Sequence, residues 1–288
     1  MAILNKSFSD RTLKYIYTLK RSINEMKSPD KDFFLLSLLC ILNDISKAKK
    51  SGGFLRITNQ DKVTKEVVKK RFIKNSEKLI DELKLYKFSN ASAKAVVGDA
   101  RKFPKEIKRN KYDAIITSPP YPNRHDYTRI YELELLVGFI DSNKSLKDLR
   151  YHTLRSHVEA RKVHVTEKYH ILPQLEKLIE NLRGRELNNP QLIPMLYGYF
   201  EDMYLSLREM CAVLKPGKHI GLVVSNVSFA GIMFPVDELL AEIGEQVGLM
   251  AEYIYILRYR GNSSQQMLKN KRQPSRESLI VWRKSGKA

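Results

Sequence analysis

The chain has 288 residues, 43% of them apolar, which is enough for one sizeable core or a core with a helical appendage. Its 51 Lys and Arg against 32 Asp and Glu give a formal net charge of +19, which favours a polyanionic partner, most commonly nucleic acid. The first residues lack the apolar region of a secretory signal, and no apolar run approaches the roughly 18–20 residues of a membrane-spanning helix, so a membrane protein is not expected.

The two cysteines, Cys40 and Cys211, are too few for a disulfide framework and fit a reducing compartment. Cys211 lies in "LREMCAVLKPG" at helical spacing, so we expect it in the core rather than in a reactive site. We expect a cytoplasmic protein.

Residues 1–90 are expected to form a mostly helical segment. The stretch 33–46 is apolar nearly all round, which predicts a buried helix. The stretch 63–86 has helical spacing, with Lys and Glu on its exposed face. Between them, 51–57 contains two glycines and is read as a break.

From residue 91 onward, short apolar strands alternate with helices. The expected strands are 93–97, 112–117, 218–225, 252–259 and 278–283, with an amphipathic helix at 235–247. This alternation predicts a doubly wound α/β sheet, whose ligands lie beyond the carboxyl ends of its strands. Residues 141–195 interrupt the pattern with a basic, His-rich stretch, expected to be a helical insertion within a catalytic part spanning 91–288.

The most informative stretch is Ser118-Pro119-Pro120-Tyr121, directly after the strand 112–117. Proline cannot donate to a sheet ladder and fixes its own φ, so the pair ends the strand in a stiff loop. A stiff carbonyl beside a Ser hydroxyl provides two hydrogen-bond acceptors, and the tyrosine ring provides a stacking surface. Together they suit a planar group with an exocyclic amino group, such as a flipped-out base.

Two hydrogen bonds from that amino group to fixed acceptors would draw its nitrogen toward sp³ geometry, freeing the lone pair to attack an electrophilic methyl group. No covalent intermediate, and hence no catalytic cysteine, is required. A cytosine-C5 mechanism would need one, and the sequence has no Pro-Cys pair.

The stretch "DAIITSPPYPNRHDYTRIYELELL" resembles the catalytic motif of the S-adenosylmethionine-dependent amino-methyltransferases of DNA. The "SPPY" form is typical of cytosine-N4 enzymes, and "DPPY" of adenine-N6 enzymes. The segments "VVGDAR", "LKPGKHIGLVVSN" and "RESLIVWRK" are similar to the family's third, fifth and closing strands, so the likeness covers residues 93–288. Protein-glutamine methyltransferases use a related "NPPY" loop; Ser118 and the net charge disfavour that reading.

This resemblance implies a Rossmann-like sheet and assigns roles to individual residues. Ser118, Pro119, Pro120 and Tyr121 would hold and stack the target base. The cofactor S-adenosylmethionine would contact Gly98, Asp99, Ala100 and Thr117, with Asp99 on its adenine. The plainer alternatives are a rigid surface turn for the Ser-Pro-Pro-Tyr stretch and a helix N-cap for Asp99.

The family's glycine-rich loop after the first strand is absent from this sequence. No two of its thirteen glycines are separated by one residue, so the Gly-x-Gly that lets backbone approach the cofactor is missing. In the family's strand order 3-2-1-4-5-7-6, the strands found match three to seven, while one and two are missing. We expect a second polypeptide to supply them in a hetero-oligomer; a truncated start or a degenerate fragment would produce the same pattern.

Two basic segments are candidates for contacting double-stranded DNA. The first includes Arg258, Arg260, Lys269, Lys271, Arg272 and Arg276, and Arg124 and His125 directly follow the Ser-Pro-Pro-Tyr stretch. The second contains Arg150, Arg155, Arg161 and Lys162. A solvated surface loop is an equally good reading of any single residue in the first segment.

Other polar residues have plainer interpretations. The spacing of His152, His157, His164 and His170 matches no usual ligand pattern, so no metal site is expected. His125 and Asp126 could contact DNA or cap the helix that follows. Asn226 could line the pocket or be a polar strand end.

The resemblance therefore predicts a subunit of a restriction-modification methyltransferase that methylates cytosine N4 in double-stranded DNA. Adenine N6 is the alternative within the class. A non-catalytic DNA-binding or target-recognition subunit is the alternative outside it, since the glycine loop is absent while the Ser-Pro-Pro-Tyr stretch is intact.

Overall fold

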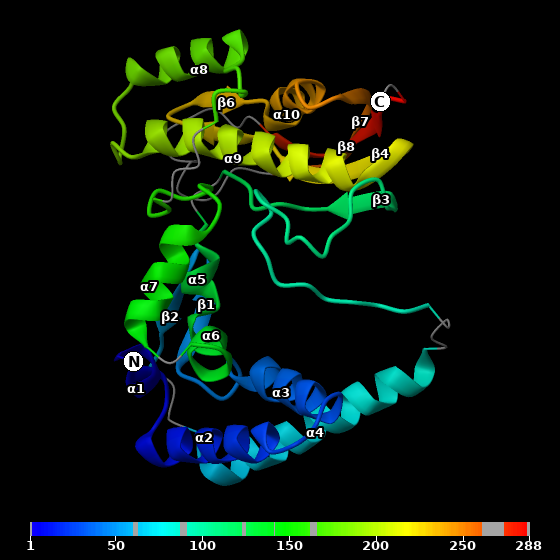
Figure 1. Cartoon of the computed structure of the whole chain (residues 1–288). Helices are drawn as coiled ribbons and strands as arrows, with labels where there is room; N and C mark the ends of the chain where they lie inside the picture. Colours follow the sequence, from blue (N-terminus) through cyan, green and yellow to red (C-terminus); the bar gives the residue numbers. More distant parts are fainter. Residues whose placement is uncertain are drawn as a thin grey trace. The chain divides into compact units, whose positions relative to one another are not determined.

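The computed structural model describes residues 2–59, 63–86, 91–122, 125–140, 142–161, 166–260 and 274–286, apart from the side chain of Arg260. The chain divides into two compact units (Figure 1). The first unit is Met1–Lys94 with Asp126–Tyr151, and the second is Ala95–His125 with His152–Ala288. Across these described ranges, no helix is long and apolar enough to cross a membrane.

The first unit is mainly helical. Its elements are α1 (Ala2–Ser7), α2 (Asp10–Asn24), α3 (Asp30–Ile41), β1 (Ala48–Ser51), β2 (Phe54–Ile57), α4 (Lys65–Leu85), α5 (Tyr127–Ile130), α6 (Glu132–Gly138) and α7 (Asn143–His152). The expected helix at 63–86 corresponds to α4. The helix expected to be buried at 33–46 corresponds to α3, which ends at Ile41 and buries only Ser37, Leu38 and Ile41. The break expected at 51–57 holds only for the tight turn of the β1–β2 hairpin, where Gly52 adopts a φ of 58°, because 54–57 form the strand β2.

The boundary between the units differs from the expected one at residue 90. Leu133, Leu136 and Val137 of α6 are buried in the same cluster as Leu4 and Phe8 of the first helices. Segment 126–151 therefore packs with the N-terminal helices, because its apolar side chains find their partners there and not on the sheet. The expected insertion at 141–195 includes α7 and α8 (Pro173–Arg183) and runs into α9 (Leu192–Val213).

The second unit is built on a four-stranded sheet with the order β3-β4-β8-β7. These strands are β3 (Tyr112–Thr117), β4 (Leu214–Ser225), β7 (Leu249–Arg260) and β8 (Ser275–Lys284). The strand β3 is parallel to β4, and β8 is antiparallel to both β4 and β7. The order 4-5-7-6 expected for these four strands is confirmed. A short hairpin of β5 (Val227–Phe229) and β6 (Ile232–Phe234) follows β4.

The strand expected at 93–97 is wrong. Residues 91–98 are described, form no strand, and are exposed, with the Val97 side chain fully open to solvent. A strand needs backbone hydrogen bonds to a neighbour, and none of the described strands lies beside this segment. Its β-forming sequence therefore lacks the partner that would order it.

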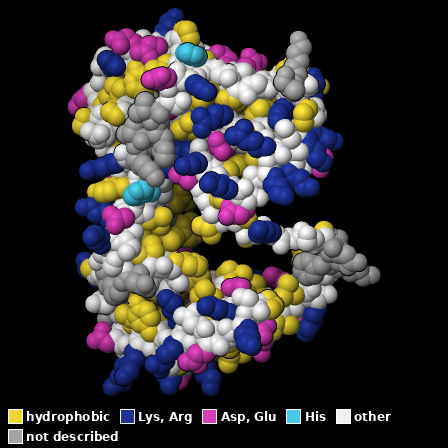
Figure 2. Space-filling view, in the orientation of Figure 1, with side chains coloured by type: hydrophobic (Ala, Val, Ile, Leu, Met, Phe, Trp, Pro, Cys, Tyr) yellow, Lys and Arg dark blue, Asp and Glu magenta, His cyan; other side chains and the backbone are white. Residues whose placement is uncertain are grey.

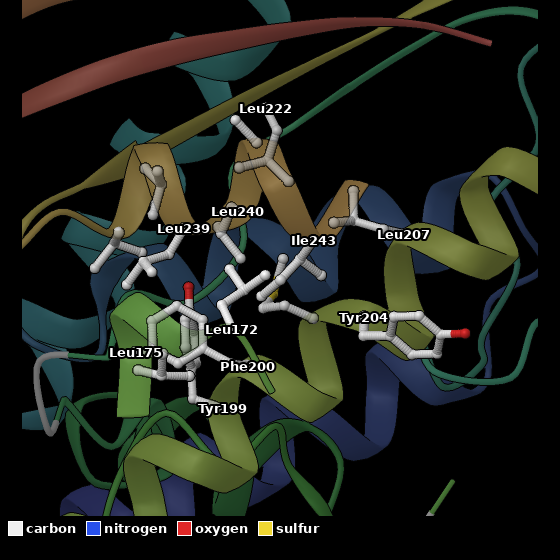
Figure 3. Close-up of a cluster of buried hydrophobic side chains, with 14 of the residues drawn as sticks. Leu172, Leu175, Tyr199, Phe200, Tyr204, Leu207, Leu222, Leu239, Leu240 and Ile243 are labelled. Atoms are coloured by element: carbon white, nitrogen blue, oxygen red, sulfur yellow. The ribbon is translucent and has the colours of Figure 1, made fainter. Parts of the chain in front are cut away.

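Helices α9 and α10 (Val236–Glu245) cover one face of the sheet. Figure 3 shows side chains from α8, α9 and α10 meeting Leu222 of β4 in a closely packed cluster. Fully buried Trp282 of β8 donates its indole N–H to the Ala241 carbonyl of α10 at 3.1 Å. These contacts anchor the helices to the sheet.

Within the described part of the chain, the opposite face of the sheet carries exposed side chains, and we call it the open face. Ile116, Gly221, Val281 and Tyr253 lie opposite one another across the four strands, so their side chains share that face. Ile116 is 86% exposed and Tyr253 is 55% exposed. Tyr255, two residues further along β7, stacks on Tyr253 with ring centroids 5.4 Å apart. Apolar side chains that mixed α/β sheets normally cover are left in solvent here.

Candidate active site at the carboxyl ends of the strands

The loop Ser118–Tyr121 lies where β3 ends. The ladder with β4 runs up to the pair Thr117–Leu222, and Pro119 and Pro120 have no N–H to continue it. Ser118 is exposed, whereas the two prolines and Tyr121 are partly buried. Tyr121 packs against the core of the second unit. The loop is thus held to the sheet through its tyrosine while its serine faces solvent.

The hydroxyl of Tyr121 is held by an acid from the closing strand. It donates to Glu277 Oε1 at 3.0 Å, although the two residues are 156 positions apart. Glu277 is only 6% exposed and also accepts a very short hydrogen bond from Nε of Arg258, at the end of β7. This bond and the charge of Glu277 raise the pKa of Arg258 above its usual value. Residues from β7, β8 and the β3 loop thus meet at one edge of the sheet.

Two more hydroxyls lie near that of Tyr121. Ser118 Oγ is 3.5 Å from it, at the long end of hydrogen-bond distances. The hydroxyl of Tyr199, on α9, is fully buried and makes no hydrogen bond within the described part of the chain. Burial, and then the neighbouring Tyr121, raise the pKa of Tyr199. Tyr121 therefore sits between an exposed serine, a buried acid and a buried tyrosine.

A second polar cluster fixes the ends of β4 and β8 at the same edge. Asp237 of α10 is fully buried and accepts hydrogen bonds from Arg276 Nε at 2.7 Å and Ser278 Oγ at 2.6 Å. Asn226 accepts from the Asp237 backbone N–H at 3.2 Å. Burial alone would raise the pKa of Asp237, but the bonds from Arg276 and Ser278 lower it overall. Asn226 and Arg276 therefore hold the start of α10 against the ends of β4 and β8 at this edge.

The candidate cofactor acid, Asp99, is engaged by a buried arginine. Arg101 donates from Nε to Asp99 Oδ1 at 2.9 Å and from a terminal nitrogen to Asp99 Oδ2 at 2.8 Å. The same guanidinium reaches Asp202 Oδ2 at 3.0 Å. Burial alone would lower the pKa of Arg101, but Asp99 and Asp202 raise it overall. Both carboxylate oxygens of Asp99 thus already have a charged partner.

The alternative role of Asp99 as a helix N-cap is wrong, since no helix begins in residues 100–111, all of which are described. The Asp99 side chain instead accepts from the Arg101 backbone N–H at 2.9 Å and closes a turn. Gly98 precedes this turn, and a Cβ there would lie 2.6 Å from Pro104 Cγ. Gly98 is therefore required by the close approach of Pro104, while Ala100 lies within the turn.

Two arginines of the second basic segment form internal ion pairs. Arg155 donates to Asp202 Oδ1 at 2.7 Å and to Glu201 at 3.0 Å, with a side chain only 9% exposed. Arg150 pairs with Asp126 at 2.7 Å. Asp126 also accepts from the Thr128 backbone N–H at 2.9 Å, which confirms that it caps a helix, α5. Arg155 and Arg150 thus stabilise the folded chain through ion pairs with its own carboxylates.

The first basic segment is described only in part. Arg124, Lys269, Lys271, Arg272 and the side chain of Arg260 lie outside the described residues. Of the remaining predicted residues, Arg258 is 60% exposed beside Glu277, and His125 is partly buried just beyond the loop. Among the described residues, no three His, Cys, Asp or Glu are arranged to hold a metal ion.

Sequence patterns assigned no role to Glu277, Asp202 or Asp237. One signal was present for Glu277: an antiparallel closing strand begins at the edge where the other strands end, so an acid at its start must lie beside their loops. For Asp202 and Asp237 no comparable signal was present, because other acids share each helix, Glu201 and Glu209 on α9 and three glutamates on α10.

The sequence is similar to three curated type II methyltransferases. It is 32% identical to M.BsoBI of Geobacillus stearothermophilus over 88% of this chain and 60% of that protein. It is 32% identical to M.AvaI of Nostoc sp. over 88% of this chain and 59% of that protein. The match to M.MvaI of Kocuria varians is 22% identical over 94% and 61%, respectively. The chain spans about 60% of the length of these relatives.

No protein-family model matches the sequence. Among solved structures, a candidate DNA modification methylase from Thermus thermophilus, complexed with S-adenosyl-L-methionine, aligns with a TM-score of 0.35 and 16% identity. That alignment covers 67% of this chain and 55% of the other.

Proposed function

The chain is homologous to type II DNA methyltransferases, and we propose that it carries the base-binding half of a restriction-modification enzyme. The reaction would transfer a methyl group from S-adenosyl-L-methionine to the exocyclic amino group of a flipped base in double-stranded DNA. Cytosine N4 is the favoured target, because the loop reads Ser-Pro-Pro-Tyr. Such an enzyme would act in the cytoplasm, where its DNA substrate is found.

The observation that carries this proposal is the position of Ser118–Tyr121. The loop follows a parallel strand at the carboxyl edge of the sheet, where ligands of such sheets bind. Its serine is exposed and its tyrosine is tethered to Glu277. A base entering this loop would stack on the Tyr121 ring and place its amino group beside the Ser118 hydroxyl. We call these four residues the base clamp.

The methyl donor does not fit the described residues of this chain alone. Asp99 is occupied by Arg101 on both carboxylate oxygens, and the sequence has no Gly-x-Gly loop. The strand expected before Gly98 is also not formed. We therefore propose that the main cradle of S-adenosyl-L-methionine, which supplies the electrophilic methyl group, lies on a second polypeptide.

The unfinished sheet supports that division. Among the described strands, β3 pairs only with β4, so the backbone of its other edge is available to a further strand. The open face beside this edge leaves Ile116 and Tyr253 in solvent. A polypeptide supplying strands beside β3 and helices over the open face would cover both.

The charge of the chain suits DNA as the substrate. Figure 2 shows Lys and Arg side chains spread over the visible surface of both units. The formal net charge is +19, and a basic surface attracts phosphates irrespective of their sequence. Arg258 would bring a positive charge close to the base clamp, since it pairs with the same Glu277 that holds Tyr121.

The catalytic role is tested by Ser118→Ala and Tyr121→Ala in the assembled complex, with Ser285→Ala at the far end of β8 as a matched control. We expect both loop variants to abolish transfer of radiolabelled methyl groups to DNA while DNA affinity survives. Unchanged methylation would favour the non-catalytic alternative, a DNA-binding subunit. Mass spectrometry of the digested product would then distinguish N4-methylcytosine from N6-methyladenine.

The partner is tested separately, by measuring S-adenosyl-L-methionine binding by calorimetry. We expect no binding by this chain alone. Binding should appear after co-expression with the product of an adjoining reading frame that carries a Gly-x-Gly loop. If the isolated chain binds the cofactor tightly and methylates DNA, the proposed division is wrong.

A further inference from the structure

We propose that Glu277 sets the direction of the hydrogen bonds through Tyr121 to Ser118, so that the Ser118 oxygen is presented to the substrate as an acceptor. Glu277 is then a positioning residue that acts through Tyr121. This inference rests on the proposed function and deepens it, because it assigns a task to an acid outside the base clamp.

The direction of these hydrogen bonds is set first by the carboxylate of Glu277. Glu277 pairs with the guanidinium of Arg258, and a carboxylate held in such a pair offers only acceptor positions. Tyr121 has a single hydroxyl proton, and its oxygen lies 3.0 Å from Glu277 Oε1. Tyr121 must therefore donate to Glu277. Its oxygen lone pairs are left to accept from a second group.

Ser118 is that second group, with its Oγ 3.5 Å from the Tyr121 oxygen. Since the Tyr121 proton is committed to Glu277, the Ser118 hydroxyl can only donate in this pair. The lone pairs of Ser118 then face away from its own proton and are open to an incoming N–H. Contacts of this kind are often long without substrate and shorten when it binds.

The direction matters because an exocyclic amino group brings two N–H donors. If the serine proton pointed at that amino group, two hydrogen-bond donors would face each other and no hydrogen bond would form. With the order fixed by Glu277, the Ser118 oxygen accepts one of the two protons before any rearrangement. Because the Ser118 hydroxyl is oriented before the reaction, the activation barrier of methyl transfer is lowered without stronger binding of DNA.

Glu277→Gln separates this role from packing, because the amide has nearly the same shape. A Gln amide can donate to the Tyr121 oxygen, which would turn the Tyr121 proton toward Ser118 and the Ser118 proton toward the base. We expect kcat to fall by about 10- to 100-fold, as for loss of one charge-assisted hydrogen bond. The KM for DNA should stay at its wild-type value, and the variant should remain folded, as circular dichroism measures.

The matched control is Glu252→Gln, since Glu252 forms a similar pair with Arg283, at 2.6 Å, near the other end of β7 and β8. Its kcat should equal that of the wild type. Tyr121→Phe removes the connecting hydroxyl, so Glu277→Gln should cause no further loss in that background.

The kinetic parameters are measured from DNA methylation by the assembled complex. A wild-type complex that methylates no DNA would overturn the proposed function together with this inference. If the wild type is active, two results overturn this inference alone. One is a kcat of Glu277→Gln equal to that of the wild type. The other is a Glu277→Gln substitution that lowers kcat as much in the Tyr121→Phe background as in the wild type. Loss confined to kcat and abolished in that background supports it.

Discussion

The carboxylate of Asp202 lies 3.0 Å from the guanidinium of Arg101, with both side chains closed to solvent. The second oxygen of Asp202 binds Arg155 at 2.7 Å, so one acid bridges two nearly buried cations, whose charges Asp99 and Glu201 also balance. This arrangement connects the turn at 99–101, the segment at 152–155 and helix α9 within the second unit.

Replacing Asp202 with Ala should destabilise the second unit strongly. Removing one member of a buried ion pair typically costs about 3–5 kcal/mol, because the remaining charge is left in a poorly solvating environment. The free energy of unfolding from urea titrations measures this. Glu106→Gln, which changes an exposed acid of the same unit, is the control. A loss below about 1 kcal/mol, within the range of exposed pairs, would contradict the role given to this network.

The stability provided by Asp237 should depend on pH in a definite direction. Its folded-state pKa is lowered, so the benefit is complete above the unfolded pKa of about 3.9 and is lost as the pH falls through the lower folded value. Asp237→Asn should therefore destabilise by about 2–3 kcal/mol at pH 7.

That difference should shrink below pH 4. Urea titrations of both proteins across the acid range measure the difference directly. A gap between wild type and variant that is constant from pH 7 to the acid limit would contradict the lowered pKa.

The two cysteines should differ in reactivity. Cys40 is exposed, whereas Cys211 is buried, and its burial raises the pKa of the thiol and reduces the reactive thiolate. Titration with a chromogenic disulfide near pH 8 should show one fast thiol, with the second reacting only on unfolding. Cys40→Ser should abolish the fast phase. Two equally fast thiols would show that Cys211 is accessible.

Gly244→Ala should strain the contact between α10 and the sheet. A Cβ there would lie 2.4 Å from Nε1 of Trp282, the single tryptophan of the chain. Overpacking of this kind costs about 1–3 kcal/mol. Tryptophan fluorescence during unfolding reports the loss directly. Gly286→Ala, where a Cβ meets nothing within 4 Å, should leave the transition unchanged.

Ile116→Asp should separate folding from assembly. Because Ile116 is 86% exposed, the isolated chain should unfold at the wild-type midpoint. In the co-expressed pair, a charge on the open face would face apolar surface, so gel filtration should show loss of the complex. Leu36→Asp, at a 53% exposed apolar position of the first unit, serves as the control. An intact complex with Ile116→Asp would place the partner elsewhere.

Local sequence patterns predicted the four strands of the sheet, and the family resemblance implied their order. Apolar runs bounded by Pro-Pro, Pro-Gly or polar residues specify such strands through short-range chemistry. The same reasoning failed at 93–97, where the β-forming residues are present but no neighbouring strand exists among the described residues. It also misplaced α6, because an apolar helix face does not reveal which of two cores it joins.

The sequence by itself determined the stiff Ser-Pro-Pro-Tyr loop after β3 and the lack of a Gly-x-Gly loop, since both depend on adjacent residues and on what proline and glycine backbones permit. The tertiary structure alone decided that Tyr121 is held by Glu277, and that Asp99 is held by Arg101 and, through it, joined to Asp202. The contacts of Tyr121 with Glu277 and of Arg101 with Asp202 join residues more than a hundred positions apart. They exist because antiparallel pairing brings the start of β8 beside the end of β4, and because the packing of α9 brings Asp202 to the turn at Arg101.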